Sequence, residues 1–201
     1  PILKRTFARS FEVSPLLSKN IRLHKKERLK LTNDQIMILN LLKNRTRVAI
    51  SGGAGTGKTI IAVEKTKRLA EQGLKTLLIC YNRQLADHLN LSCKGVSNLQ
   101  VMSFHYLCYS HSKKFSKANP DRDVLAEAKK TYPGQDEFGV QMPAALALTV
   151  DNPDFQFEAI VCDEGQDFRE EFWLPIELLL KDIKKSPFYV FFLMKIKIST
   201  L

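Results

Sequence analysis

The chain has 201 residues, of which 44% are hydrophobic and 26% charged, and these proportions are ordinary for a soluble globular domain. No apolar run approaches the roughly 18 residues of a membrane span, so we expect no membrane partner. The four cysteines lack the C-x-x-C spacing of zinc sites, and they predict neither a metal cluster nor a disulfide framework. The cysteine pattern favours a reducing compartment, and we expect a cytoplasmic protein.

The net charge of +10 is unevenly distributed along the chain. Residues 1–50 hold twelve lysines and arginines against three acidic residues, and residues 51–118 hold ten against three. Residues 119–180 reverse the balance, with fourteen acidic residues against four basic ones. This asymmetry is typical of a protein with one side facing a polyanion, but solvated helix faces with a basic tail would produce it equally well.

The first elements are a basic segment and a helix. Residues 1–30 are weakly periodic, and we interpret them as an arm or as the remnant of an upstream domain. A helix is predicted next, because Thr32 or Asn33 can cap it and apolar residues follow at helical spacing. The amide of Gln35 in its first turn can hold an adenine edge, although its position alone favours a solvated surface residue.

Residues 51–59 fit the phosphate-binding loop pattern G-x-x-x-x-G-K-[ST]. A β-branched run at 47–50 predicts a buried strand before the loop, and a helix is predicted after it as far as Gln72. In this order the glycines let backbone amides close around phosphates at a helix N-terminus. Lys58 would reach the β- and γ-phosphates, and the Thr59 hydroxyl would ligate Mg²⁺. The residues predicted to bind ATP in this loop are Gly52, Gly53, Ala54, Gly55, Thr56, Gly57, Lys58 and Thr59.

Four more strand-like runs follow, at 75–80, 98–102, 158–162 and 186–193, with helical segments between them, one of them predicted at 170–181. Strands that alternate with helices imply right-handed crossovers and a parallel sheet. We therefore predict an α/β fold, a P-loop NTPase with a parallel sheet of about five strands and helices on both faces.

Ligands of such sheets collect at the carboxyl ends of the strands. The phosphate loop follows one strand directly, and three further polar stretches follow others. We expect all of them to share one edge of the sheet. The stretches are Asn82-Arg83, Ser103-Phe104-His105 and Asp163-Glu164.

The strand at 158–162 ends in two carboxylates, which is the second-site pattern of phosphate-loop ATPases. Asp163 would hold the Mg²⁺ opposite Thr59. Glu164 would orient or deprotonate the attacking water, because hydrolysis needs a base in line with the γ-phosphate. An acidic pair at a strand end can also be a solvated loop, but the phosphate loop earlier in the chain favours the catalytic interpretation.

The phosphate loop together with Asp163-Glu-Gly-Gln-Asp167 resembles the first motor domain of UvrD/Rep-like superfamily I DNA helicases, whose second motif reads Asp-Glu-x-Gln-Asp. Residues 81–86 and 103–105 stand where that family has its strand-contacting motifs. Residues 31–35 resemble its leading glutamine motif, and this makes Gln35 an expected nucleotide ligand. The resemblance covers about residues 31–192.

The resemblance implies a RecA-like domain that uses ATP to move on single-stranded DNA or RNA. Asn82, Arg83, Ser103 and His105 would contact the phosphate backbone. Phe104 or Tyr106 would offer a stacking face for a base, unless both pack in the core of an amphipathic helix. Lys58, Glu164 and Gln166 would form the catalytic set, with Gln166 coupling the γ-phosphate to a neighbouring domain.

The end of the chain departs from the family. Residues 193–201 stand where the family has an acidic, glutamine-containing third motif, and we treat them as an atypical tail. We also expect no second motor domain in cis that would supply an arginine finger. We therefore expect this chain to bind Mg·ATP, to hydrolyse it slowly and not to act as a helicase by itself. The alternative function is a non-motor ATP-binding switch that engages a protein or nucleic acid.

Overall fold

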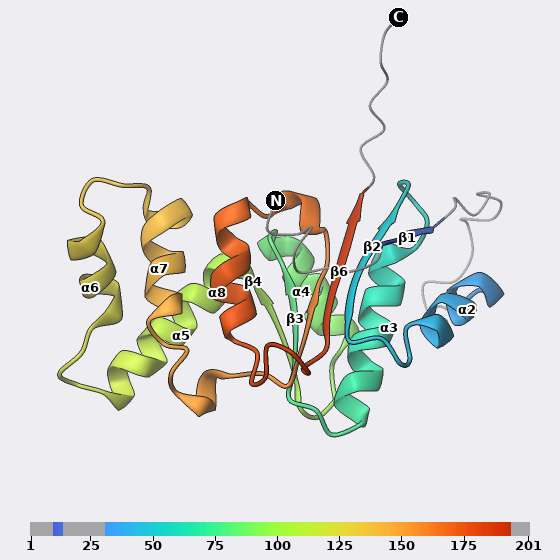
Figure 1. The fold of residues 1–201 in the computed structure, drawn as a ribbon, viewed down its shortest axis with the longest axis horizontal. Helices are drawn as coiled ribbons and strands as arrows, with labels where there is room; N and C mark the ends of the chain where they lie inside the picture. The colour runs from blue at the N-terminus through green and yellow to red at the C-terminus, as the bar shows by residue number, and fades with distance from the viewer. Residues whose placement is uncertain (1–9, 14–30, 194–201) are drawn as a thin grey trace, which may run out of the picture.

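The computed structural model describes residues 10–13 and 31–193 of the chain (Figure 1). The six strands form one parallel sheet in the order β1-β2-β6-β5-β3-β4. This arrangement confirms the predicted α/β fold. The strands are β1 (Ser10–Val13), β2 (Arg47–Gly52), β3 (Thr76–Cys80), β4 (Leu99–Ser103), β5 (Ala159–Cys162) and β6 (Phe188–Leu193).

The central strands are apolar on both sides because helices cover both faces of the sheet. Within β3, Leu77 and Ile79 contribute to one hydrophobic core, and Leu78 and Cys80 contribute to the other. All four side chains are fully buried. The alternation follows from the two-residue period of a strand, which sends successive side chains to opposite faces.

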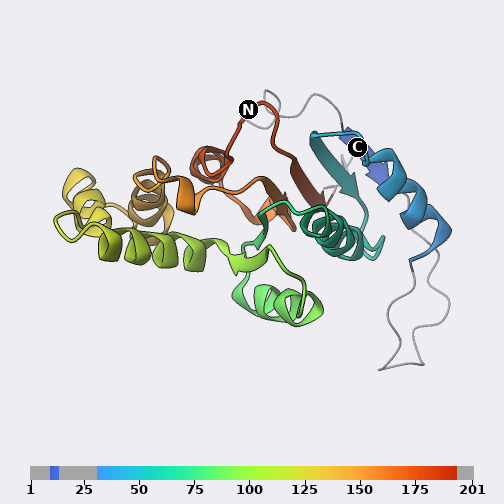
Figure 2. The ribbon, with the colours of Figure 1, turned by 90° about the horizontal axis from the view of Figure 1, so that it is seen from below.

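Helices α2 (Asn33–Leu41), α3 (Lys58–Glu71) and α4 (Arg83–Ser92) supply the core on one face. Helices α5 (Phe104–Ala118), α7 (Met142–Ala147) and α8 (Trp173–Leu178) supply the core on the other. Figure 2 shows α3 and α4 on one side of the sheet and α8 on the opposite side. The phosphate loop joins β2 to α3, and all the β-to-α connections of the predicted site leave the same edge of the sheet.

Helix α5 continues past the β4 edge of the sheet and carries a small helical extension (Figure 2). Its far end packs against α6 (Val124–Thr131) and α7 around a third, smaller core. The short turns of this region are a π turn at Glu137–Gln141 and a 3-10 turn at Pro153–Phe155. The core of the extension consists of Phe115, Val124, Ala128, Ala145 and Phe155.

Two predictions about secondary structure need correction. The helix predicted at 170–181 is a 3-10 turn, Glu170–Phe172, followed by the short helix α8. It ends early because Phe157 forms a bridge to this segment, with its amide donating to the Leu179 carbonyl at 2.7 Å and its carbonyl accepting from the Lys181 amide at 2.8 Å. Strand β1 was not predicted at all, since it lies within the basic segment 1–30.

The rest of that segment and residues 194–201 of the predicted tail lie outside the described residues.

Candidate nucleotide-binding site

The phosphate loop has the predicted strand–loop–helix form. Strand β2 ends at Gly52, and α3 begins at Lys58. Gly55 and Gly57 both have left-handed backbone conformations, with φ values of 75° and 81°. Side chains with a Cβ rarely adopt this conformation, so these glycines let the loop turn back on itself at the helix N-terminus. The loop geometry therefore suits backbone amides that surround an anion.

Gln35 packs directly against this loop. A Cβ at Gly57 would overlap the Gln35 side-chain amide, and the side chain is only 5% exposed. Gln35 also completes a capping box with Thr32. Its side-chain Oε1 accepts from the backbone amide of Thr32 at 3.0 Å, and its backbone amide donates to the Thr32 hydroxyl at 3.3 Å. Thr32 is therefore the helix cap, and the solvated interpretation of Gln35 is wrong.

Lys58 is buried beneath the loop with its ammonium on backbone oxygens. Its Nζ donates to the carbonyls of Gly52 at 3.0 Å and Gly53 at 2.7 Å. Burial lowers the pKa of Lys58, while the nearby carboxylates of Glu164 and Asp163 oppose this shift. The ammonium thus lies within the electrostatic reach of both acidic residues, as the sequence predicts for one shared site.

Asp163 follows β5 directly and is completely buried. Its amide donates to the Ile79 carbonyl at 2.9 Å, which anchors it between neighbouring strands. Within the described part of the chain, neither carboxylate oxygen has a hydrogen-bond partner. Burial raises the pKa of Asp163 to about 6, and the adjacent Thr59 hydroxyl opposes that shift. A buried carboxylate without partners, next to a hydroxyl, is an oxygen set that fits Mg²⁺.

Glu164 and Gln166 form the next part of the site. Glu164 has a left-handed backbone, with φ 52° and ψ 47°, which is uncommon for a residue other than glycine. Gln166 Nε2 donates a hydrogen bond to Glu164 Oε2. Gly165 packs closely against β6, since a Cβ at this position would lie 2.5 Å from Val190 Cγ1. The half-buried Glu164 carboxylate is therefore held at the same edge as Lys58.

The predicted nucleic-acid contacts lie at the same sheet edge but differ in exposure. Asn82 caps α4, and its Oδ1 accepts from the amides of Gln84 at 2.8 Å and Leu85 at 3.2 Å. Arg83 is exposed, whereas Ser103 is buried. The partly exposed His105 ring has its Nε2 3.2 Å from the Phe138 carbonyl oxygen.

Phe104 requires a correction. Its side chain is fully buried, and its ring stacks on Phe172 with centroids 4.4 Å apart. It is a core residue and offers no face to a nucleic-acid base. Tyr106, two positions further on, is 57% exposed. The sequence alone left both aromatic residues open, because the segment that covers Phe104 is far away in the chain.

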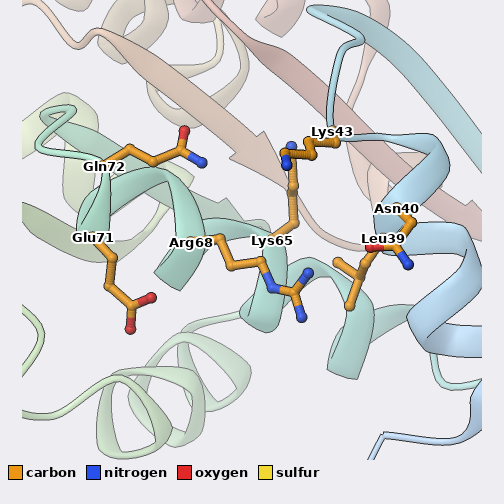
Figure 3. A pocket seen from close by; sticks show the side chains of 7 residues that line it. All are labelled: Leu39, Asn40, Lys43, Lys65, Arg68, Glu71 and Gln72. Carbon is orange, nitrogen blue, oxygen red and sulfur yellow. The ribbon is translucent and has the colours of Figure 1, made fainter.

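A separate polar pocket of about 280 Å³ lies between α2 and α3 (Figure 3). Its buried Lys65 donates to the Leu42 carbonyl at 3.1 Å, and the Nζ lies 4.7 Å from the centroid of the Tyr189 ring. Burial lowers the pKa of Lys65 to about 8, and Arg68 adds to the shift. Leu42 is the C-cap of α2, so Lys65 satisfies a helix-end carbonyl, and we assign this pocket a structural role.

Comparison with known families agrees with a phosphate-binding loop at residues 51–59. Residues 35–190 match the model of the AAA domain family (AAA_19). The chain belongs to this family. Its domain is a P-loop NTPase domain that is found in UvrD/Rep-like helicases. A search of curated proteins gave no match.

Among residues 10–13 and 31–193, no helix is long and apolar enough to cross a membrane. The same residues contain no group of three or more His, Cys, Asp or Glu side chains arranged to hold a metal ion. The candidate magnesium site is therefore of another kind, in which a single buried carboxylate and a hydroxyl would share the ion with phosphate oxygens.

Proposed function

We propose that this AAA domain is an ATP-hydrolysing motor domain of the UvrD-like helicase type, which acts on single-stranded nucleic acid. The observation that carries the proposal is the buried Asp163 carboxylate, which lacks a hydrogen-bond partner among the described residues and lies beside Thr59. A buried charge without a partner is costly, and a bound divalent cation would offset that cost.

Each residue has a distinct part in this proposal. Lys58 would exchange its loop carbonyls for β- and γ-phosphate oxygens. Thr59 and Asp163 would hold Mg²⁺, which would neutralise charge on the phosphates when bound. Glu164 would accept a proton from the attacking water, with the amide of Gln166 fixing its orientation.

Gln35 would act at the other side of the loop. It is held by Thr32 and packs on Gly57, so its position is fixed relative to the phosphates. We propose that its remaining amide hydrogen-bonding capacity orients the nucleotide base. The exposed Arg83 and the partly exposed His105 would face the nucleic-acid backbone at the same edge.

The proposal is tested by phosphate release with and without a single-stranded oligonucleotide. We expect stimulation by the oligonucleotide in the wild type. A Glu164→Gln variant should bind ATP normally and lose about 10²–10⁴-fold in turnover, which is the usual contribution of a general base. Turnover of Glu164→Gln at the wild-type rate would remove Glu164 from the mechanism. A wild-type rate that ignores the oligonucleotide would favour the alternative of an ATP-binding switch.

A further inference from the structure

Helix α5 has an exposed face that carries two tyrosines and, further along the helix, two lysines. Tyr106 is 57% exposed and Tyr109 is 44% exposed, and the side chains of Lys113 and Lys117 are exposed as well. Residues three, four or seven positions apart lie on the same side of a helix, so these four side chains form one line. We call Tyr106, Tyr109, Lys113 and Lys117 the α5 stripe.

The charge of α5 favours an anionic partner. The helix contains three lysines and no acidic residue along its 15 positions. The ammonium of Lys113 lies 5.4 Å from the centroid of the Tyr109 ring, so a cation and an aromatic ring share the same surface. Exposed tyrosines next to lysines form a surface that suits single strands, because bases stack on the rings and phosphates pair with the ammonium groups.

The α5 stripe is continuous with the sheet edge of the candidate site. Helix α5 begins immediately after β4, and its second residue, His105, packs edge-on against Tyr81 with ring centroids 5.2 Å apart. Tyr81 in turn precedes Asn82 and Arg83, which are the N-cap and the first residue of α4. Helix α5 then runs beyond the sheet (Figure 2). The rise from Tyr106 to Lys117 is about 17 Å, at 1.5 Å per residue.

The opposite face of α5 packs into the hydrophobic cores, so the α5 stripe faces solvent. Phe104, Leu107, Cys108 and Phe115 face the cores, and α6 and α7 pack on that side. The stripe occupies the opposite side of the helix. Two large aromatic side chains and two lysines are therefore exposed on that side.

We propose that the α5 stripe extends the nucleic-acid path beyond the sheet edge, with Tyr106 and Tyr109 stacking on bases of a single strand and Lys113 and Lys117 pairing with its phosphates. This inference rests on the proposed function, since it assumes that nucleic acid approaches the edge where Arg83 lies. It adds a second contact region about five nucleotides long, at the roughly 3.4 Å spacing of stacked nucleotides.

The test uses the whole 201-residue chain and a fluorescein-labelled 20-nucleotide oligo-dT strand, with binding followed by anisotropy. Tyr106→Ala/Tyr109→Ala should weaken binding by at least about 30-fold, because the stacking of two bases is lost. The matched variant Tyr106→Phe/Tyr109→Phe keeps both rings and should bind within about twofold of the wild type.

The lysines are tested through the salt dependence of binding. Lys113→Gln/Lys117→Gln should reduce the slope of log K against log salt by about 1.4, at about 0.7 per phosphate contact. The control is Lys184→Gln/Lys185→Gln, which removes the same charge from the exposed turn before β6. This turn lies at the amino ends of the strands, whereas the candidate site lies at their carboxyl ends. The control should leave the slope unchanged.

Two results would overturn the inference in different ways. If the stripe variants bind as tightly as their controls while Arg83→Ala binds more weakly, the stripe is not part of the path and the proposed function stands. If the wild-type chain itself does not bind the strand, the inference and the nucleic-acid part of the proposed function both fail. Normal binding of a fluorescent ATP analogue by every variant would show that the fold is intact.

Discussion

Replacing Gly57 by alanine tests how the phosphate loop and the first helix are joined. Gly57 has φ 81°, and alanine in this left-handed conformation costs about 1–2 kcal/mol. The new Cβ would also occupy the space of the Gln35 amide. Moving Gln35 away would disrupt its capping box with Thr32, which is worth about 0.5–2 kcal/mol. Gly57→Ala should therefore destabilise the fold by about 1.5–4 kcal/mol.

Gly55→Ala provides the matched control. Gly55 has a similar φ of 75°, but a Cβ there would meet no heavy atom within 4 Å. It should lose about 1–2 kcal/mol from backbone strain alone. Urea unfolding of both variants is compared with that of Gln35→Ala and of Gln35→Ala/Gly57→Ala. This cycle separates the backbone strain at Gly57 from the overlap with the Gln35 side chain. With Gln35 already shortened, adding Gly57→Ala should cost only the strain, so the two substitutions are coupled by about 0.5–2 kcal/mol.

The two glycine variants should differ in stability, and the substitutions at 35 and 57 should not be additive; equal stability or strict additivity would contradict the overlap. Either result would mean that the Gln35 side chain is not packed on the loop. Nucleotide affinity measured on the same proteins gives a second reading, since a displaced Gln35 should also weaken binding of the base.

Two further predictions concern buried groups whose pKa values are shifted. His111 is buried, and burial lowers its pKa to about 4, with Lys114 and Lys75 adding to the shift. Between pH 6.5 and 4 the unfolded chain therefore binds a proton at this residue that the folded chain does not. Wild-type stability should therefore fall by up to about 2.7 kcal/mol more than that of His111→Leu from pH 6.5 to 4.5. The same difference in urea unfolding free energy between the two proteins at both pH values would refute this. The pKa of Lys65 is lowered from 10.5 to about 8 in the folded chain. Above pH 8 the folded chain loses this proton while the unfolded chain still binds it, so stability rises with pH. The wild type should gain about 2 kcal/mol over Lys65→Met between pH 8 and 10, whereas a constant difference in unfolding free energy would contradict that shift.

Local signals in the sequence were sufficient for the phosphate loop. A β-branched run, a glycine-rich turn and a helix with a clear end are encoded within residues 47–73, so their order is readable without any tertiary information. The placement of Asp163 opposite Thr59 was also predictable, because parallel strands end at the same edge of a sheet. Asp163 does lie beside Thr59 in the structure.

The features that were missed depend on contacts between distant segments. Phe104 is buried by Phe172, and α8 ends early because Phe157 pairs with the chain after it. Neither partner is visible from the local pattern. Gln35 is buried because α2 packs next to the loop, although first-turn glutamines are usually solvated. Strand β1 adds to the sheet edge from a basic segment with weak periodicity, where hydrophobic pattern gives little guidance.

If the loop around Lys58 binds Mg·ATP, calorimetric titration with a non-hydrolysable Mg·ATP analogue should show that binding in the wild type. Lys58→Ala removes the ammonium that lies on the loop and should weaken binding by at least about tenfold, the usual effect of losing a hydrogen bond to a charged group. Lys67→Ala on the same helix should bind like the wild type. Equal affinities for the wild type and Lys58→Ala would contradict the assignment of this loop as the nucleotide site.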